Sequence, residues 1–289
     1  MKIGGKIFLL LCFLGTSTVF FVSCERIYST PEENIELPKK VASITEAILS
    51  ITEMVEHINS TNSTQDIQKN VFNALEKEIG CSLNILDSIT TDGDGYEYTA
   101  EFTGLKSRFD RKRRIGKFTV SLSKNYREIG ASSIVSVAPN DPFQILSLDD
   151  SLTNVFGDIS FTRTNLNQVK IEYSHLSVIQ NKKNYSVDGN YTMSWTSGAE
   201  TDGLIWDEVK ISGNGNFLID NTEESNWDII LPLEKNYEYG CSENLIKGIL
   251  EINRVGERFK VDFDPFENKS CNNIVKIYYA GKEFEVRIY

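Results

Sequence analysis

The sequence predicts a mainly β protein, built as an antiparallel meander and preceded by a helical hairpin. From Cys81 onward, apolar side chains alternate with polar ones in short runs, which is the pattern of strands with one solvated face. Short turn signals separate these runs, so the connections leave no room for the crossover helices of a parallel sheet. About a dozen strands exceed a comfortable flat sheet, so we expect an open barrel or a sandwich.

The alternation is clearest in the apolar residues of Tyr96–Phe102, Phe118–Leu122, Tyr185–Trp195 and Phe259–Phe263. Glycine, proline, asparagine and aspartate supply the turns between strands. The turn signals are Asp92-Gly93, Asn140-Asp141-Pro142, Gly213-Asn214-Gly215, Val255-Gly256 and Ala280-Gly281. The pattern places one antiparallel β domain over residues 81–289.

A helical period precedes the strands. The first apolar stripe consists of Val41, Ile44, Ile48, Ile51, Val55 and Ile58. A second stripe consists of Ile67, Val71, Leu75 and Ile79, and Gly80 is a natural C-terminal stop. The two stripes predict a helical hairpin over residues 39–80. We expect them to pack on each other and on the β domain, although a partner-binding surface is the alternative.

The N-terminus has the order of a secretory signal. Lys2 and Lys6 precede an apolar stretch from Ile7 to Phe21, and small residues lead to Cys24. Residues 1–23 are therefore predicted to be a signal peptide. Residues 24–38 are polar and contain two prolines, so they are predicted to be a tether.

Phe21-Val22-Ser23-Cys24 resembles the lipobox of bacterial lipoprotein signal peptides. The resemblance implies cleavage before Cys24, diacylglycerol on its thiol and a fatty acyl chain such as palmitate on the new amino terminus. The alternative is an uncleaved transmembrane helix, and both interpretations place the rest of the chain outside the cytoplasm. The expected location is the cell envelope, at the outer membrane, with its surface and periplasmic faces both open.

The β domain contains three distinctive segments, Phe259-Lys260-Val261-Asp262-Phe263-Asp264, Cys271-Asn272-Asn273 and Phe284-Glu285-Val286-Arg287-Ile288, with weaker pieces around Asp110–Phe118 and Tyr185–Gly189. Together they resemble a group of uncharacterised Bacteroidetes-type lipoproteins. The resemblance implies a β fold in the cell envelope, and it supplies no catalytic residues.

The net charge of the chain limits the classes of partner that it can bind. The chain has 30 basic and 41 acidic residues, for a formal net charge of −11. Such a body is repelled by nucleic acid phosphates and by anionic lipid surfaces. We therefore expect no nucleic acid partner, and membrane attachment through acyl chains instead of a basic face.

The cysteines fit an exported protein. Cys241 and Cys271 lie 30 positions apart in the C-terminal region, and the compartment permits a disulfide between them. Spacing alone cannot establish the pairing, so three free thiols are the alternative. Cys81 is expected to be a buried, small apolar side chain.

One segment resembles an EF-hand calcium loop. Asp92, Asp94 and Glu101 provide oxygen donors at suitable intervals around Gly95. Residues 96–102 alternate as a strand, however, so an Asp-Gly hairpin turn is the favoured interpretation. Histidine and cysteine do not cluster as zinc ligands, and no cofactor is predicted.

Two other features suggest binding. Arg111, Lys112, Arg113 and Arg114 form the one basic cluster of the acidic chain, and arginine matches phosphate or sulfate groups of glycans. A solvated hairpin loop is the favoured alternative. Trp206 lies beside polar loop residues, so it is the best candidate for an exposed aromatic contact, whereas Trp195 and Trp227 are expected in the core.

Signs of catalysis are sparse. The chain has two histidines, His57 and His175, and lacks a nucleophile elbow, so no catalytic residue is assigned. The leading prediction is a lipid-anchored envelope protein with a non-enzymatic binding or structural role. A glycan or an envelope protein is the expected partner. The alternatives are a periplasmic carrier of lipids or small apolar ligands, and a glycan-directed hydrolase.

Overall fold

The computed structural model describes residues 31–61, 80–87, 95–108, 110–146, 152–200, 204, 207–238, 241–242, 244–269 and 271–288. Within these residues, one long helix, α1 (Pro31–Thr61), is followed by fourteen strands. The strands are β1 (Cys81–Asp87), β2 (Glu97–Lys106), β3 (Arg113–Leu122), β4 (Ser132–Val137), β5 (Phe143–Leu146), β6 (Leu152–Asn165), β7 (Gln168–Gln180), β8 (Lys183–Ser197), β9 (Glu208–Ile219), β10 (Glu223–Asn236), β11 (Lys247–Arg254), β12 (Glu257–Asp262), β13 (Ile274–Tyr279) and β14 (Lys282–Arg287). The predicted signal peptide and Cys24 lie outside the described residues.

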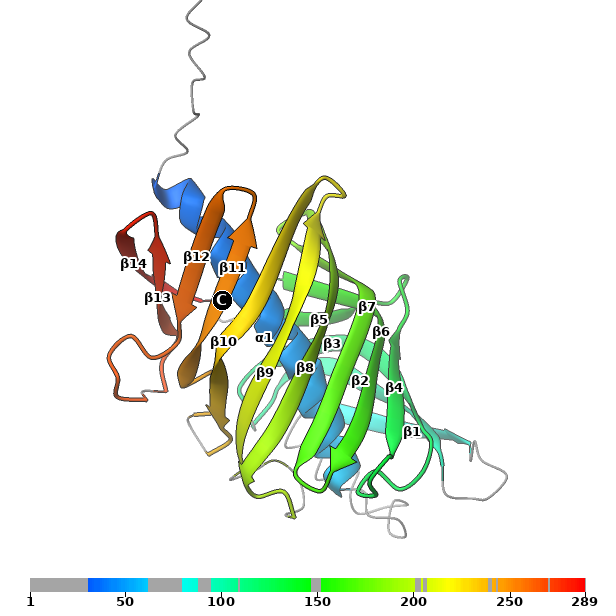
Figure 1. Cartoon of the computed structure of the whole chain (residues 1–289). Coiled ribbons are helices and arrows are strands. Elements are labelled where there is room, and N and C mark those ends of the chain that lie inside the picture. Colours follow the sequence, from blue (N-terminus) through cyan, green and yellow to red (C-terminus); the bar gives the residue numbers. More distant parts are fainter. Residues whose placement is uncertain are drawn as a thin grey trace, which may run out of the picture.

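All fourteen strands belong to one antiparallel sheet that curls around α1 (Figure 1). The strands follow one another across the sheet from β1 to β14, except that β4 and the short β5 share the place between β3 and β6. The predicted antiparallel meander is therefore confirmed. The fold is neither a two-sheet sandwich nor a barrel around an empty centre, because a single sheet wraps a helix.

The helix begins earlier than the sequence pattern predicts. Residues 31–38, expected to end the tether, form the first two turns of α1. Pro31 occupies the first helical position, where its missing N–H is harmless and its φ is suitable. Leu37 is buried and extends the apolar stripe toward the N-terminus, which gives the early turns a packing partner. The predicted second helix lies outside the described residues.

From Ile44 to Asn59 the helix is buried on every side. Its apolar stripe, from Val41 to Ile58, packs in the core as predicted. Polar residues of the opposite side are buried as well, namely Thr45, Glu46, Ser50, Thr52, Glu53, Glu56, His57 and Asn59. An amphipathic pattern predicts one buried face, but the curled sheet surrounds both. Each of the apolar side chains contributes about 1.5–3 kcal/mol when fully buried, so α1 is the centre of the core.

The predicted turn at Gly213-Asn214-Gly215 is wrong, because these residues lie inside β9. The glycines are needed for packing on the inner face of the sheet. A Cβ atom on Gly215 would lie 2.7 Å from Cζ2 of Trp227, and one on Gly213 would lie 2.1 Å from the Asn190 carbonyl oxygen. The indole of Trp227 therefore lies directly against the backbone of β9.

A disulfide joins Cys241 and Cys271, whose Cα atoms are 4.8 Å apart. It connects the segment after β10 with the segment before β13. Cys81 is a free thiol at the start of β1, and burial raises its pKa well above the ordinary range. A buried thiol of this kind is unreactive because the thiolate is the nucleophile.

Candidate functional site

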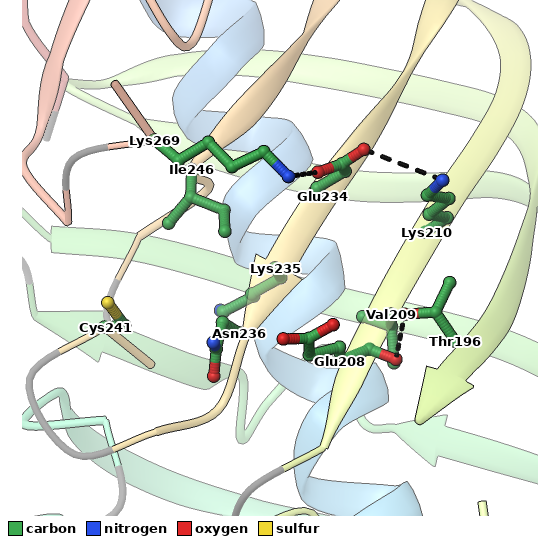
Figure 2. Close-up of a pocket in the computed structure, with 10 residues that line it drawn as sticks. All are labelled: Thr196, Glu208, Val209, Lys210, Glu234, Lys235, Asn236, Cys241, Ile246 and Lys269. Atoms are coloured by element: carbon green, nitrogen blue, oxygen red, sulfur yellow. Dashed lines mark hydrogen bonds and ion pairs between the residues drawn. The ribbon is translucent and has the colours of Figure 1, made fainter. Parts of the chain in front are cut away.

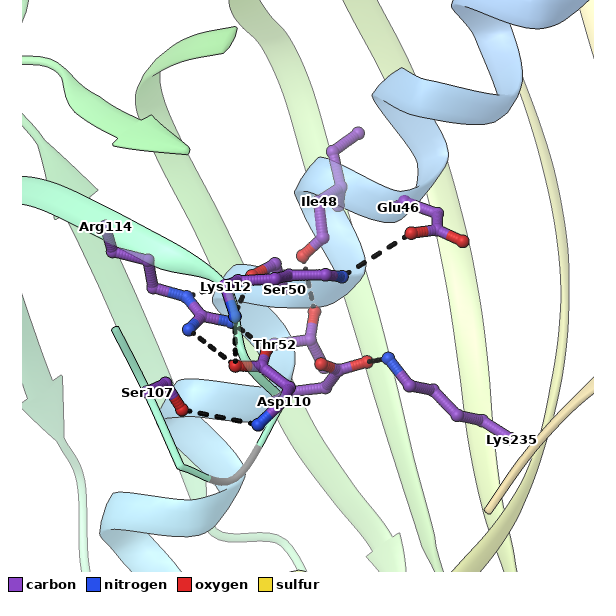
Figure 3. Close-up of polar contacts among 10 residues, drawn as sticks. Glu46, Ile48, Ser50, Thr52, Ser107, Asp110, Lys112, Arg114 and Lys235 are labelled. Carbon is purple, nitrogen blue, oxygen red and sulfur yellow. Dashed lines mark hydrogen bonds and ion pairs between the residues drawn. The ribbon is translucent and has the colours of Figure 1, made fainter. Parts of the chain in front are cut away.

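Charged side chains gather between α1 and the inner face of the sheet (Figure 3). The helix contributes Glu46, Ser50 and Glu53, whose spacings of four and three place them on one side. Strands or connections far apart in the sequence supply the partners. We call this set, with its partners Asp110, Lys112, Arg114 and Lys235, the central ion cluster.

The β2–β3 connection and β3 form one half of the cluster. Arg114, whose side chain is 1% exposed, donates to Ser50 Oγ at 2.7 Å and to Asp110 Oδ1 at 3.0 Å. Burial alone would raise the pKa of Asp110, but the Arg114 guanidinium outweighs burial and holds that pKa far below its usual range. Lys112 Nζ lies 3.5 Å from Glu46 Oε2. This side of the cluster ties β3 to the middle of the helix.

Strand β10 forms the other half. Lys235 is 3% exposed and pairs with Glu53, which is completely buried. Burial lowers the pKa of Lys235, while the Glu53 carboxylate favours its charged form. Since β3 and β10 lie on separate parts of the sheet, the pairs bridge the interior through α1.

Another ion pair, outside the central ion cluster, lies one turn further along the helix. Glu56 Oε2 is 3.3 Å from the Arg163 guanidinium of β6, and that guanidinium lies over the rings of Tyr126 and Trp195. Burial raises the pKa of Glu56 to about 8, although Arg163 opposes the rise. His57 Nδ1, beside it, accepts a hydrogen bond from the Leu204 amide at 3.2 Å.

The structure divides the predicted basic cluster. Lys112 and Arg114 face α1, as described above, whereas Arg111 and Arg113 are exposed. Arg113 Nε donates to the Gly104 carbonyl oxygen at 3.1 Å, and Arg111 has a φ of 58°. The four side chains therefore do not form one surface for sulfated or phosphorylated groups.

The other predicted site residues give no assembled site. Trp206, Asp92 and Asp94 lie outside the described residues. Glu101 is exposed on β2, opposite Lys117. Within the described parts of the chain, no three acidic, histidine or cysteine side chains are grouped to hold a metal ion.

Ser174, His175 and Asp188 meet on the outer face, but their arrangement is not a catalytic triad. Ser174 Oγ lies 2.8 Å from His175 Nδ1, and Asp188 Oδ1 lies 3.6 Å from the same nitrogen. A triad places serine and aspartate on different ring nitrogens. His175 also has a left-handed φ of 53° at a β-bulge, where Asp188 accepts its backbone N–H at 2.7 Å. The contacts therefore stabilise the bulge.

Two clefts open along the sheet, one beside β9 and β10 and the other beside β11, β12 and β13. The first cleft, of about 340 Å³, is crossed by Glu234, which pairs with Lys269 at 2.9 Å and Lys210 at 3.7 Å (Figure 2). The second cleft, of about 330 Å³, is lined by Ile230, Glu251, Arg258, Lys260 and Tyr278, among others. Ion pairs lie in both clefts, and the second also presents the aromatic ring of Tyr278.

Sequence reasoning missed the charged interior, yet a signal was present. In three strands a basic residue occupies a position whose neighbours at i ± 2 or i ± 4 are buried apolar residues. These residues are Arg114 in β3, Arg163 in β6 and Lys235 in β10. A buried cation at such a position requires a buried anion. Asp110 provides it for Arg114, and Glu56 and Glu53 of α1 provide it for Arg163 and Lys235.

The chain matches no family model, no curated protein and no solved structure. In the described residues, no helix combines the length and the apolar character needed to cross a bilayer.

Proposed function

We propose that this chain is a lipid-anchored protein of the cell envelope, at the outer membrane, with a non-enzymatic binding or structural role. The lipobox-like residues ending at Cys24 support the anchor. The buried charged side chains of the central ion cluster pair with one another and hold α1 in place.

The observation that carries this proposal is the occupation of the inner face by α1. A carrier of lipids or small apolar ligands would use a lined space inside the curved sheet, and the side chains of α1 take that position. The apolar contacts and the buried ion pairs make the helix part of the core. The outer face of the sheet is then the surface on which a partner binds.

The position of α1 also favours a body held close to its membrane. Between Cys24 and Pro31 the chain has residues 25–30 only, which reach roughly 20 Å when fully extended. A short link to a rigid helix restricts how far the sheet moves from the lipid surface. This restriction suits a protein that presents a fixed surface within the envelope.

The test is the fate of Cys24 in the full-length chain, expressed in a bacterium with an outer membrane. We expect mass spectrometry of the purified protein to show an N-terminal Cys24 carrying acyl groups, and the protein to fractionate with the outer membrane. The Cys24→Ser variant should remain uncleaved and unacylated. Cys12→Ser is the matched control, because Cys12 lies within the predicted signal and its loss should leave acylation intact.

Two results would contradict the proposal. Equal processing of the wild-type and Cys24→Ser chains would exclude the lipid anchor. Release of reducing ends from a polysaccharide by the purified protein would instead establish the hydrolase alternative.

A further inference from the structure

We infer that the outer face of the sheet carries a binding track for neutral glycans, which ends in the second cleft. This inference rests on the proposed binding role and names the class of partner. The outer track consists of two rows of cross-strand paired residues. The first row is Asn190, Asn214, Asp228, Glu251, Lys260 and Tyr278. The second row is Asp188, Asn216, Asn226, Asn253 and Arg258.

The register of the sheet builds the rows. Asn190 of β8 is opposite Asn214 of β9, which is opposite Asp228 of β10. These residues alternate with buried ones, such as Tyr191 and Trp227, so their side chains point outward. Neighbouring strands are about 4.8 Å apart, and each step along a row therefore presents one polar group. A repeating polymer fits such a repeating surface.

The middle of the track has rigid support from the inner face. Gly189 and Gly215 are paired between the two rows. Their hydrogens let the Trp227 indole lie against the backbone, since a Cβ atom on either glycine would approach Cζ2 within 2.8 Å. Trp227 is itself packed on Tyr191, with ring centroids 5.0 Å apart. A preorganised surface loses less entropy when it binds.

The side chains of the track match hydroxyl groups. A carboxamide offers both donors and acceptors, and a sugar hydroxyl likewise donates and accepts. Asn190 Nδ2 donates to Asn214 Oδ1 at 3.1 Å, which orients the two amides.

The second cleft provides an aromatic end for the track. Tyr278 lines it, with Lys260 Nζ 5.6 Å from the ring centroid. Glu251 accepts from Arg258 and from Asn253 Nδ2, so its carboxylate is held in the same cleft. The apolar face of a sugar ring packs on an aromatic side chain while its hydroxyls reach the polar rim.

Charge selects the kind of glycan. Carboxylates occur in both rows, at Asp188, Asp228 and Glu251, and the net charge of the chain is −11. An anionic polysaccharide or a nucleic acid would be repelled. The exposed basic side chain of Arg258 already pairs with Glu251. The track therefore suits an uncharged, hydroxyl-rich chain.

The experiment measures retardation of the detergent-solubilised full-length protein in native gels that contain neutral or anionic polysaccharides. We expect retardation by at least one neutral polysaccharide, unchanged by added salt. Asn214→Ala and Tyr278→Ala should each weaken binding about threefold to tenfold, the range for loss of one net hydrogen bond or contact. Thr162→Ala, on the same face in β6, is the matched control and should bind like the wild type.

Absence of retardation in all neutral gels would overturn the inference, as would binding confined to anionic gels and abolished by salt. Equal weakening by Thr162→Ala would also overturn it, because the track would then not be the site. Each variant is first checked for an unchanged unfolding midpoint. Acylation of Cys24 together with a negative gel would leave the proposed function in place and remove only the glycan track.

Discussion

The two faces of the sheet differ in how they accommodate polar side chains. The inner face buries full charges, such as Lys235 and Arg114, and pairs each with a carboxylate. The outer face carries amides, such as Asn214 and Asn226, and also charged side chains, such as Asp228, that remain in contact with solvent. A buried charge without its partner is strongly destabilising, whereas an exposed amide is nearly neutral. The buried charges of the inner face thus stabilise the fold, and the exposed polar groups of the outer face are available for recognition.

The test with the largest expected effect on stability removes one partner of a buried ion pair. Lys235→Met leaves Glu53 buried without its cation, so we expect the free energy of unfolding to fall by about 3–5 kcal/mol. Glu53→Leu should have a similar effect, and the double variant should recover much of the loss because no charge is stranded. Urea unfolding followed by circular dichroism measures all three.

The control for that test is an ion pair on the outer face. Lys210 lies 3.7 Å from Glu234 and is half exposed, so Lys210→Met should change stability by at most about 1 kcal/mol. Equal losses from Lys210→Met and Lys235→Met would remove the distinction between the two faces.

The second test concerns Gly215, which lies between the two outer rows and leaves room for the Trp227 indole on the inner face. In Gly215→Ala the added methyl group meets the Trp227 ring and the Asp188 carbonyl oxygen, 2.7 Å and 2.2 Å away. We expect a loss of about 1–3 kcal/mol from overpacking, measured as a lower unfolding midpoint. Ser212→Ala, in the same strand but pointing outward, should unfold like the wild type. Matching midpoints for the two variants would show that β9 has room to shift.

Gly215 also shows where sequence reasoning succeeds and fails. The period-two alternation predicted the strands and their antiparallel order, because burial of one face is local information. The motif Gly213-Asn214-Gly215 was interpreted as a turn, since glycine and asparagine are common there. The glycine at position 215 is instead required by the indole of Trp227. That side chain becomes its neighbour only when β9 and β10 pair. The rows of the outer track are similarly invisible before the register is known.

The helix gives the same lesson. The apolar stripe of α1 was predictable from its spacing, but Glu53 and Glu56 resemble the solvated side of any surface helix. Only the cations of the surrounding strands show that this side is buried. The sheet curls as a single layer instead of splitting into a sandwich, because that helix lies at its centre.

The third test uses the pH dependence of stability to detect the burial of the Glu56 carboxyl group. Unfolded Glu56 has the ordinary pKa of 4.5, and burial raises the folded value to about 8. Between these values folding takes up a proton, so the stability contributed by this group falls as pH rises, by about 1.4 kcal/mol per pH unit. Glu56→Gln should remove this slope. Urea unfolding at several pH values between 5 and 8 measures it, and parallel curves for the two proteins would contradict the burial effect.

The smallest expected effect on stability lies on the outer face. Asn190 contacts Asn214 through one exposed hydrogen bond, so Asn190→Ala should change the free energy of unfolding by no more than about 0.5 kcal/mol. The same variant should lower retardation in neutral polysaccharide gels, because it removes one amide from the first row. A variant that unfolds like the wild type but binds less would separate recognition from folding. A loss of stability comparable with that of Lys235→Met would instead mean that the outer amides, too, hold the sheet together.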